Sequence, residues 1–220
     1  GMVVVSLIWG ANFTANKYAL DTIPPLAFGA ARFVMASVLL WLVVRLVATS
    51  PPLPRAAAWR LAGLGLIGNT TYQVLFMVGL DSTTAINASL IMAAMPIIVA
   101  LLGTWSGIER ASPRVWAGIA VATLGVVVVI AAQGVHFSTG TLAGDLLILG
   151  ATVAWAVFTV GVRRDGAGLD PIRVIAVSTY GGTPALVVLA WGQIRETNWA
   201  GLPPGAVGSL LYSTVLSSVV

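Results

Sequence analysis

The side chains that could carry out chemistry in this sequence are few. Its 220 residues contain no cysteine, a single histidine (His136) and seven acidic residues. The lack of cysteine excludes disulfides, thiolate metal sites and cysteine nucleophiles. One histidine and a few separated carboxylates do not provide the acid, base and nucleophile that a catalytic site brings together. We therefore expect no enzyme, no metal site and no cofactor. The Gly-rich phosphate-binding loop of P-loop ATPases is also absent from the sequence.

The polar residues that remain stand inside apolar runs, where each needs a partner. Asn12 and Asn16 are four residues apart and share one helix face, with Trp9 close to it. Residues 69–73 read Asn-Thr-Thr-Tyr-Gln, a polar density that packing alone does not readily satisfy in lipid. Two explanations stay open, namely hydrogen bonds between helices and the lining of a water-filled cavity. The candidates for such a lining are Trp9, Asn12, Asn16, Arg32, Asn69, Tyr72, Gln73, Asn87 and Trp155.

Arg32 is the most costly of these side chains. It lies roughly 10 Å along a helix from Pro25, at 1.5 Å per residue. An arginine at the bilayer centre costs about 2.5–3.5 kcal/mol on insertion scales. Its side chain either extends to the outer interface or faces a cavity, where it would attract anionic or zwitterionic solutes. We predict that Arg32 lies near the outer mouth of one cavity, which Asn12, Tyr72 and Gln73 line.

The composition predicts an integral membrane protein. Hydrophobic residues make up 58% of the chain and charged residues only 8%, with a mean hydropathy of +0.98. Soluble domains are about 45–50% apolar and about 25% charged. The net charge of +4 could indicate nucleic-acid binding in a soluble protein. Here the basic residues stand between apolar runs, where the positive-inside rule explains them better.

Eight stretches approach or exceed the roughly 20 residues that a membrane-spanning helix needs. Bacterial barrel strands are only about 9–11 residues long, so length favours helices. No aspartate or glutamate falls inside these stretches, so we expect no carboxylate that relays protons within a span. Pro96 and Pro184 fall inside spans and should kink them, whereas Pro25 and Pro171 should begin helices, the second capped by Asp170. The predicted spans are Gly1–Asn16, Thr22–Val44, Leu61–Leu80, Ser82–Ile108, Val115–Val135, Leu146–Val162, Val174–Ile194 and Thr197–Val220.

Basic residues are unevenly divided between alternate loops. Two lie in the loops that follow spans one, three, five and seven, namely Lys17 and Arg195. Because cytoplasmic loops carry the excess of Lys and Arg, this bias predicts a cytoplasmic N-terminus. Eight lie in the loops that follow spans two, four and six: Arg45, Arg55, Arg60, Arg110, Arg114, Arg163, Arg164 and Arg173.

The chain matches itself weakly at an offset of about 146 residues. Trp9 falls on Trp155, and Pro25 falls on Pro171. We therefore predict one repeat over 1–135 and a second over 144–220. Five spans precede the second repeat, so the two enter the bilayer from opposite sides, as in many secondary transporters. A complete second repeat would need roughly 60–70 further residues, so we expect it to be incomplete, with about eight spans of ten.

Several motifs resemble the EamA branch of the drug/metabolite transporter superfamily. The first helix of that family is similar to residues 9–20, Trp-Gly-Ala-Asn-Phe-Thr-Ala-Asn-Lys-Tyr-Ala-Leu, followed by Pro24-Pro25 and Ala31-Arg32-Phe33. Its fourth helix is similar to residues 84–90 with Pro96. Its terminal Gly-Glu-Arg motif is similar to Gly107-Ile-Glu109-Arg110, where Ile108 is inserted. The resemblance implies ten helices in two five-helix halves and the export or exchange of small metabolites, without identifying the substrate.

Together these features predict an all-α polytopic membrane protein built on an inverted repeat of five-helix units. The favoured function is a secondary transporter, an exporter or exchanger, that moves small polar or amphipathic metabolites through a central cavity by alternating access. Its partners would be a small-molecule substrate and the lipid bilayer of the cell (inner) membrane, with no nucleic acid and with a homodimer allowed. The alternative is a non-transporting membrane scaffold or assembly partner. Stabilisation of the purified protein by a substrate would distinguish the two.

Overall fold

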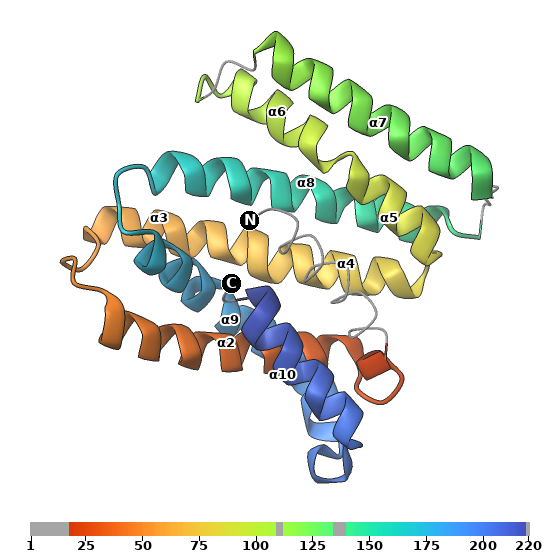
Figure 1. The fold of residues 1–220 in the computed structure, drawn as a ribbon. Coiled ribbons are helices and arrows are strands. Elements are labelled where there is room, and N and C mark those ends of the chain that lie inside the picture. The colour runs from red at the N-terminus through yellow and green to blue at the C-terminus, as the bar shows by residue number, and fades with distance from the viewer. Residues whose placement is uncertain (1–17, 109–111, 134–139, 219–220) are drawn as a thin grey trace. The chain divides into compact units, whose positions relative to one another are not determined.

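The computed structural model describes residues 18–108, 112–133 and 140–218, and these residues form helices joined by short turns (Figure 1). No strand occurs among them, which agrees with the predicted all-helical class. The helices are α2 (Pro25–Val47), α3 (Arg55–Gly65), the π-helical turn η1 (Leu66–Thr71), α4 (Tyr72–Asp81), α5 (Ala85–Ala93), α6 (Met95–Trp105), α7 (Pro113–Gln133), α8 (Leu142–Asp165), α9 (Pro171–Glu196), the 3₁₀ turn η2 (Trp199–Gly201) and α10 (Pro204–Ser218).

Five helical stretches of the described chain are long and apolar enough to cross a membrane. Each covers most of one span predicted from the sequence. The helix α7 coincides with the predicted span Val115–Val135, and α10 lies within the last one. The predicted span Gly1–Asn16 lies outside the described residues. The five stretches are Pro25–Val47, Arg55–Asp81, Ile86–Trp105, Leu142–Asp165 and Pro171–Glu196.

Prolines set the starts of two of these helices, as predicted. Pro25 and Pro171 each begin a helix, where the missing N–H removes no helical hydrogen bond. The Asp170 side chain accepts hydrogen bonds from the backbone N–H groups of Ile172 and Arg173. It therefore caps α9 in the way that the sequence predicts.

The two prolines inside spans behave differently. Pro96 follows a turn at Ala94 that separates α5 from α6, so the fourth span, which we predicted to be kinked by this proline, is broken just before it. Pro184 lies inside α9, which continues through it as one helix of 26 residues.

The third span begins earlier than predicted, at Arg55 and not at Leu61. Pro54 precedes it, and the helix then includes Arg55 and Arg60, which we expected in a loop. Helical hydrogen bonding does not require apolar side chains, and a first turn at the membrane surface tolerates arginine. The helix runs on through η1 into α4, so Asn69 falls near the middle of the stretch Arg55–Asp81.

The chain forms two compact units. Unit 1 contains Gly1–Leu66 and Gly168–Val220. Within it α2 packs against α9 and α10, and α3 packs against α9. Glycine permits the close approach of α3 and α9, since a Cβ on Gly181 would lie 2.4 Å from the Ala62 backbone. Hydrogen bonds join α2 to α9, among them one between the hydroxyls of Ser37 and Thr183, which are 146 residues apart.

Unit 2 contains Ile67–Ala167. The helix α8 packs along α4 and also contacts α5 and α6, while α7 contacts α5 (Figure 1). The first turn of α8 lies directly against the end of α4. A Cβ on Gly144 would lie 2.5 Å from the backbone of Ser82. This unit carries most of the predicted site residues that the structure describes.

Candidate substrate site

Three of the nine predicted site residues, Trp9, Asn12 and Asn16, lie outside the described residues. Arg32 belongs to unit 1, on α2. The other five lie in unit 2, on η1, α4, α5 and α8: Asn69, Tyr72, Gln73, Asn87 and Trp155.

An aromatic cluster joins α4 to α8 at the level of Tyr72. The ring centroids of Tyr72 and Trp155 are 4.9 Å apart, and those of Trp155 and Phe158 are 5.2 Å apart. Tyr72 also stacks on Phe76 at 5.7 Å. The structure thus brings together Tyr72 and Trp155, which the sequence analysis proposed as site residues independently of each other. Phe158 was missed, although its position one turn after Trp155 on the same helix face was available as a signal.

The backbone beside this cluster is a π-helical turn, Leu66–Thr71. Such turns are rare and occur often at functional sites. Gly68 within the turn is covered by the Phe158 ring, since a Cβ there would lie 2.2 Å from a ring carbon. The glycine therefore allows Phe158, and with it the aromatic cluster, to lie against the turn.

A buried polar face runs from this turn into α4. Asn69, Thr70 and Gln73 are all buried, with Gln73 only 2% exposed. Their spacing of three and four residues places them on one side of the helix. The side-chain Nε2 of Gln73 is buried and has no hydrogen-bond partner among the residues that the structure describes. An unpaired buried amide donor costs about 1–3 kcal/mol, so it calls for an explanation.

Arg32 lies two turns into α2 and is half-buried. Its guanidinium carbon is 5.1 Å from the ring centroid of Phe33, within the range of a cation–π contact. This contact lowers the cost of the charge in the apolar helix, whichever of the two predicted roles the side chain has.

Asn87 lies at the start of α5 and hydrogen-bonds a carboxylate that the sequence analysis placed in a loop. Its Nδ2 lies 3.3 Å from both side-chain oxygens of Asp145. We expected no acidic residue within a span, and this expectation was wrong. The helix α8 begins at Leu142, before the apolar run, so Asp145 is in its first turn and is 8% exposed. The helix N-terminus stabilises a carboxylate, so the helix can begin before the apolar run does. A helix start placed at the first apolar residue therefore leaves Asp145 out.

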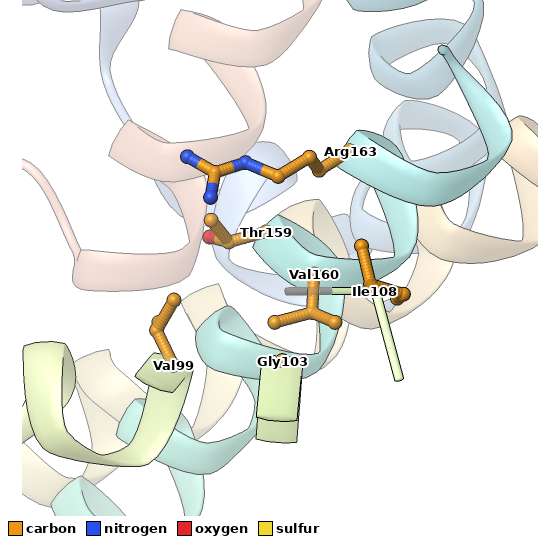
Figure 2. A pocket seen from close by; sticks show the side chains of 6 residues that line it. All are labelled: Val99, Gly103, Ile108, Thr159, Val160 and Arg163. Carbon is orange, nitrogen blue, oxygen red and sulfur yellow. The ribbon is translucent and has the colours of Figure 1, made fainter. Parts of the chain in front are cut away.

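A small hollow opens between α6 and the C-terminal part of α8 (Figure 2). Its volume is about 210 Å³, including open space. Little of that space is enclosed, so this hollow alone does not provide a site for a drug-sized ligand. It is lined by Val99, Gly103, Ile108, Thr159, Val160 and Arg163.

Long apolar helices with polar residues buried inside them define a multi-pass helical membrane protein. The chain belongs to the EamA-like transporter family, whose sequence model matches residues 1–131 and 142–220. It is therefore a membrane transporter, as the sequence motifs predicted, and its relatives are named as transporters and not as enzymes.

Two similar proteins match almost the whole chain. It is 28% identical over 219 residues to an uncharacterized transporter, YyaM, of Bacillus subtilis (strain 168), covering 98% of this chain and 72% of that protein. It is 30% identical over 222 residues to an uncharacterized transporter of Archaeoglobus fulgidus, covering 99% of this chain and 75% of that protein.

A third relative has a more specific name. A probable amino-acid metabolite efflux pump of Salmonella typhimurium is 31% identical over 158 residues, covering 70% of this chain and 49% of that protein. Among solved structures, one crystal structure of a protein matches with a TM-score of 0.75 at 18% identity, covering 96% of this chain and 71% of the other. This likeness supports the fold.

Proposed function

We propose that this protein is a secondary transporter, an exporter or exchanger, that moves small polar or amphipathic metabolites by alternating access. The substrate-facing surface includes the polar face of η1 and α4 together with the aromatic cluster of Tyr72, Trp155 and Phe158. The aromatic rings provide apolar contact area, and the polar face provides hydrogen bonds that fix a ligand's orientation.

The buried amide of Gln73 is the observation that carries this proposal. A residue that served only to join helices would have its donor paired, because an unpaired donor destabilises the fold. Within the described part of the chain, Gln73 Nε2 is instead buried without a hydrogen-bond partner. A substrate carbonyl or carboxylate oxygen would accept its hydrogen bond and remove that cost. Tyr72, the preceding residue, belongs to the aromatic cluster.

Contacts within unit 1 support an inverted repeat. The predicted offset of 146 residues relates α2 to α9, and it relates Ser37 to Thr183, whose hydroxyls are 3.0 Å apart. A two-fold axis brings equivalent residues into contact where it passes between them. The offset also relates α3 to α10. The packing of α3 on α9 therefore corresponds to the packing of α10 on α2, as a symmetry that exchanges the two repeats requires.

The substrate class to test first comes from a relative. The Salmonella typhimurium protein is named a probable amino-acid metabolite efflux pump. Amino acids and their derivatives have the carbonyl and carboxylate oxygens that the Gln73 amide would bind. We therefore propose amino-acid metabolites as the first substrates to examine.

The test is counterflow into liposomes that contain the purified protein. A panel of labelled amino acids and their N-acylated and deaminated derivatives is offered to the wild type, Gln73→Leu and an exposed-loop control, Thr49→Val. We expect saturable uptake in the wild type and the control, and a loss of about tenfold or more in Gln73→Leu, as for a buried hydrogen bond to substrate worth about 1.5 kcal/mol. Equal transport by all three proteins would contradict the assigned site. No saturable transport of any compound by the wild type would instead favour the scaffold alternative.

A further inference from the structure

An exposed stripe of side chains runs along α2 and ends in an arginine. Val34, Val38, Trp41 and Arg45 follow one another at intervals of four, three and four residues, so they share one face of the helix. All four side chains are exposed, Val38 by 57% and Trp41 by 49%. We call these four residues the α2 stripe. It is apolar from Val34 to Trp41 and is charged only at its end.

The arginine of the α2 stripe is stacked on its tryptophan. The guanidinium carbon of Arg45 lies 5.1 Å from the centroid of the Trp41 ring, within the range of a cation–π contact. A guanidinium group stacked in this way keeps N–H groups at its edge, which match the oxygens of a phosphate group in pairs. Among the residues that the structure describes, no acidic side chain pairs with Arg45.

Basic residues outnumber acidic ones around the loop that follows α2. Residues 22–80 contain four arginines and neither aspartate nor glutamate. Asp170 and Arg173 both bond the second serine-containing stretch of this surface, at the loop's own serine hydroxyl, so their two charges offset each other. The surface at this end of α2 therefore has a net positive charge, to which Arg45 and the exposed Arg55 both contribute.

A second stripe with the same spacing lies on α9 and provides an internal comparison. Pro184, Val188, Trp191 and Arg195 follow one another at the same intervals and are also exposed. We call them the α9 stripe. There Glu196 follows the arginine directly, so positive and negative charge cancel at that helix end. The α2 stripe therefore differs from the α9 stripe in its uncompensated charge.

The length of the α2 stripe fits one phospholipid in one leaflet. Arg45 follows Val34 by eleven positions, about 16 Å along the helix at 1.5 Å per residue. Half of the roughly 30 Å hydrocarbon core of a bilayer is about 15 Å. An acyl chain along the two valines would bring the glycerol region of the lipid to Trp41, because tryptophan is typical of the membrane interface, and the phosphate to Arg45. A free phosphate ion would contact only the arginine.

We propose that the α2 stripe is a binding site for an anionic phospholipid, whose phosphate group binds Arg45 and whose acyl chain lies along Val34 and Val38. The negative headgroup complements the uncompensated charge at this end of α2. The acyl chain covers the exposed apolar side chains of the same face. This site does not depend on the proposed transport function.

Quenching by brominated lipids measures which lipid occupies each stripe. Because the sequence has no cysteine, Val38→Cys and Val188→Cys each give one site for pyrene maleimide, seven positions before Arg45 and Arg195, respectively. The purified full chain is reconstituted in dioleoyl phosphatidylcholine, part of which is replaced by dibrominated phosphatidylglycerol or dibrominated phosphatidylcholine.

We expect phosphatidylglycerol to associate with the α2 stripe about fivefold more strongly than phosphatidylcholine, as for one basic residue near the membrane surface. At the α9 stripe we expect little preference. The same preference at both stripes, whether present or absent, would overturn the proposal, because it would mean that the α2 stripe is not a selective site.

Substitution of the arginines tests which residue binds the headgroup. We expect Arg45→Gln to abolish the preference at the α2 stripe and the matched control Arg195→Gln to leave it unchanged. A preference that survives Arg45→Gln would overturn the proposal. Arg45→Lys covers the case in which Arg45→Gln does not fold. It keeps the charge but loses the planar group that stacks on Trp41, so we expect a reduced preference. An unchanged preference in Arg45→Lys would overturn the role of the stacked guanidinium.

Discussion

At the scale of single residues, two glutamines inside long helices have opposite environments. Gln73 on α4 has a buried amide nitrogen that no described residue pairs with. Gln193 on α9 uses its Oε1 to accept from the backbone N–H groups of Leu26 and Ala27, at 2.8 and 3.2 Å, in the first turn of α2. The same substitution, Gln→Leu, should therefore have opposite effects on stability. We expect Gln193→Leu to destabilise the protein by about 1–3 kcal/mol because it leaves two N–H groups without their acceptor.

Gln73→Leu should leave stability unchanged or raise it, because it removes an unpaired polar group from a buried position. Thermal unfolding in detergent, followed by tryptophan fluorescence, compares the two variants directly. A Gln73→Leu variant as unstable as Gln193→Leu would mean that the Gln73 side chain has a structural partner, and the substrate assignment would then lose its main support.

Asp170, at the start of α9, gives a pH-dependent prediction. The hydrogen bond from the Ser50 hydroxyl, followed by those from the Arg173 and Ile172 N–H groups and the Arg173 charge, lowers the pKa of Asp170 below its ordinary value, while desolvation opposes this. Its stabilising contribution is therefore complete above the unfolded value of about 3.9 and is lost as the pH falls through the folded-state pKa.

Ser50→Ala removes the largest cause of that lowering. We expect the acid-induced loss of stability to begin at a higher pH in Ser50→Ala than in the wild type, and to be weakest in Asp170→Asn, which keeps an amide cap but cannot be protonated. Unfolding temperatures measured from about pH 7 to about pH 3 test this order. Superimposable curves for the wild type and Asp170→Asn would show that this carboxylate does not contribute.

At the residue scale, the sequence predicted buried polar residues where the free-energy cost of a polar group in lipid pointed to them. Tyr72 and Gln73 were nominated because polar groups are expensive in lipid, and they lie beside Trp155 and on the buried face of α4, respectively. Asp145 was missed because its burial depends on partners, Thr83 and Asn87, that are about 60 residues away along the chain. No pattern local to residues 141–146 contains that information.

At the scale of helices, glycine decides how closely α3 and α9 approach. A Cβ on Gly181 would lie 2.4 Å from the backbone of Ala62, whereas a Cβ on Gly192 of the same helix would meet nothing within 4 Å. We expect Gly181→Ala to destabilise the protein by about 1–3 kcal/mol through overpacking. Gly192→Ala should be neutral or stabilising by up to about 1 kcal/mol, because alanine favours the helix.

The comparison is made by thermal unfolding of the two variants beside the wild type. Because both sites lie on α9, differences in helix propensity cancel between them. Equal stability of Gly181→Ala and Gly192→Ala would contradict the close packing of α3 on α9.

Helix boundaries show what hydropathy can and cannot predict. The helix starts at Pro25 and Pro171 and a distortion of the helix at Pro96 were predicted, because proline acts on the backbone locally. The starts of α3 and α8 lie outside the apolar runs, at Arg55 and Leu142. At α8 the helix dipole stabilises the carboxylate of Asp145 in the first turn, and at α3 the water interface accommodates the arginines. The π-helical turn at Leu66–Thr71 had no signal that we could identify in the sequence.

At the scale of the whole molecule, the repeat and the topology depend on each other. An inverted repeat requires the two copies to cross the bilayer in opposite directions. In the proposed repeat, the loop after α2 and the loop after α9 occupy equivalent places, since the offset of 146 relates Ser37 on α2 to Thr183 on α9. They must then lie on opposite sides of the membrane. The bias of basic residues independently predicts that the first of these loops is cytoplasmic.

Introduced cysteines test this topology in a sequence that has none of its own. Ser50 is unsuitable, because its hydroxyl bonds Asp170 and Arg173. Its exposed neighbour Thr49 and the exposed Ala200 in the loop after α9 avoid this problem. We expect a membrane-impermeant maleimide to label Ala200→Cys but not Thr49→Cys in intact cells, and to label both after permeabilisation. The reverse pattern would invert the orientation while keeping the repeat. Labelling of both variants in intact cells would place the two loops on the same side and would be incompatible with an inverted repeat.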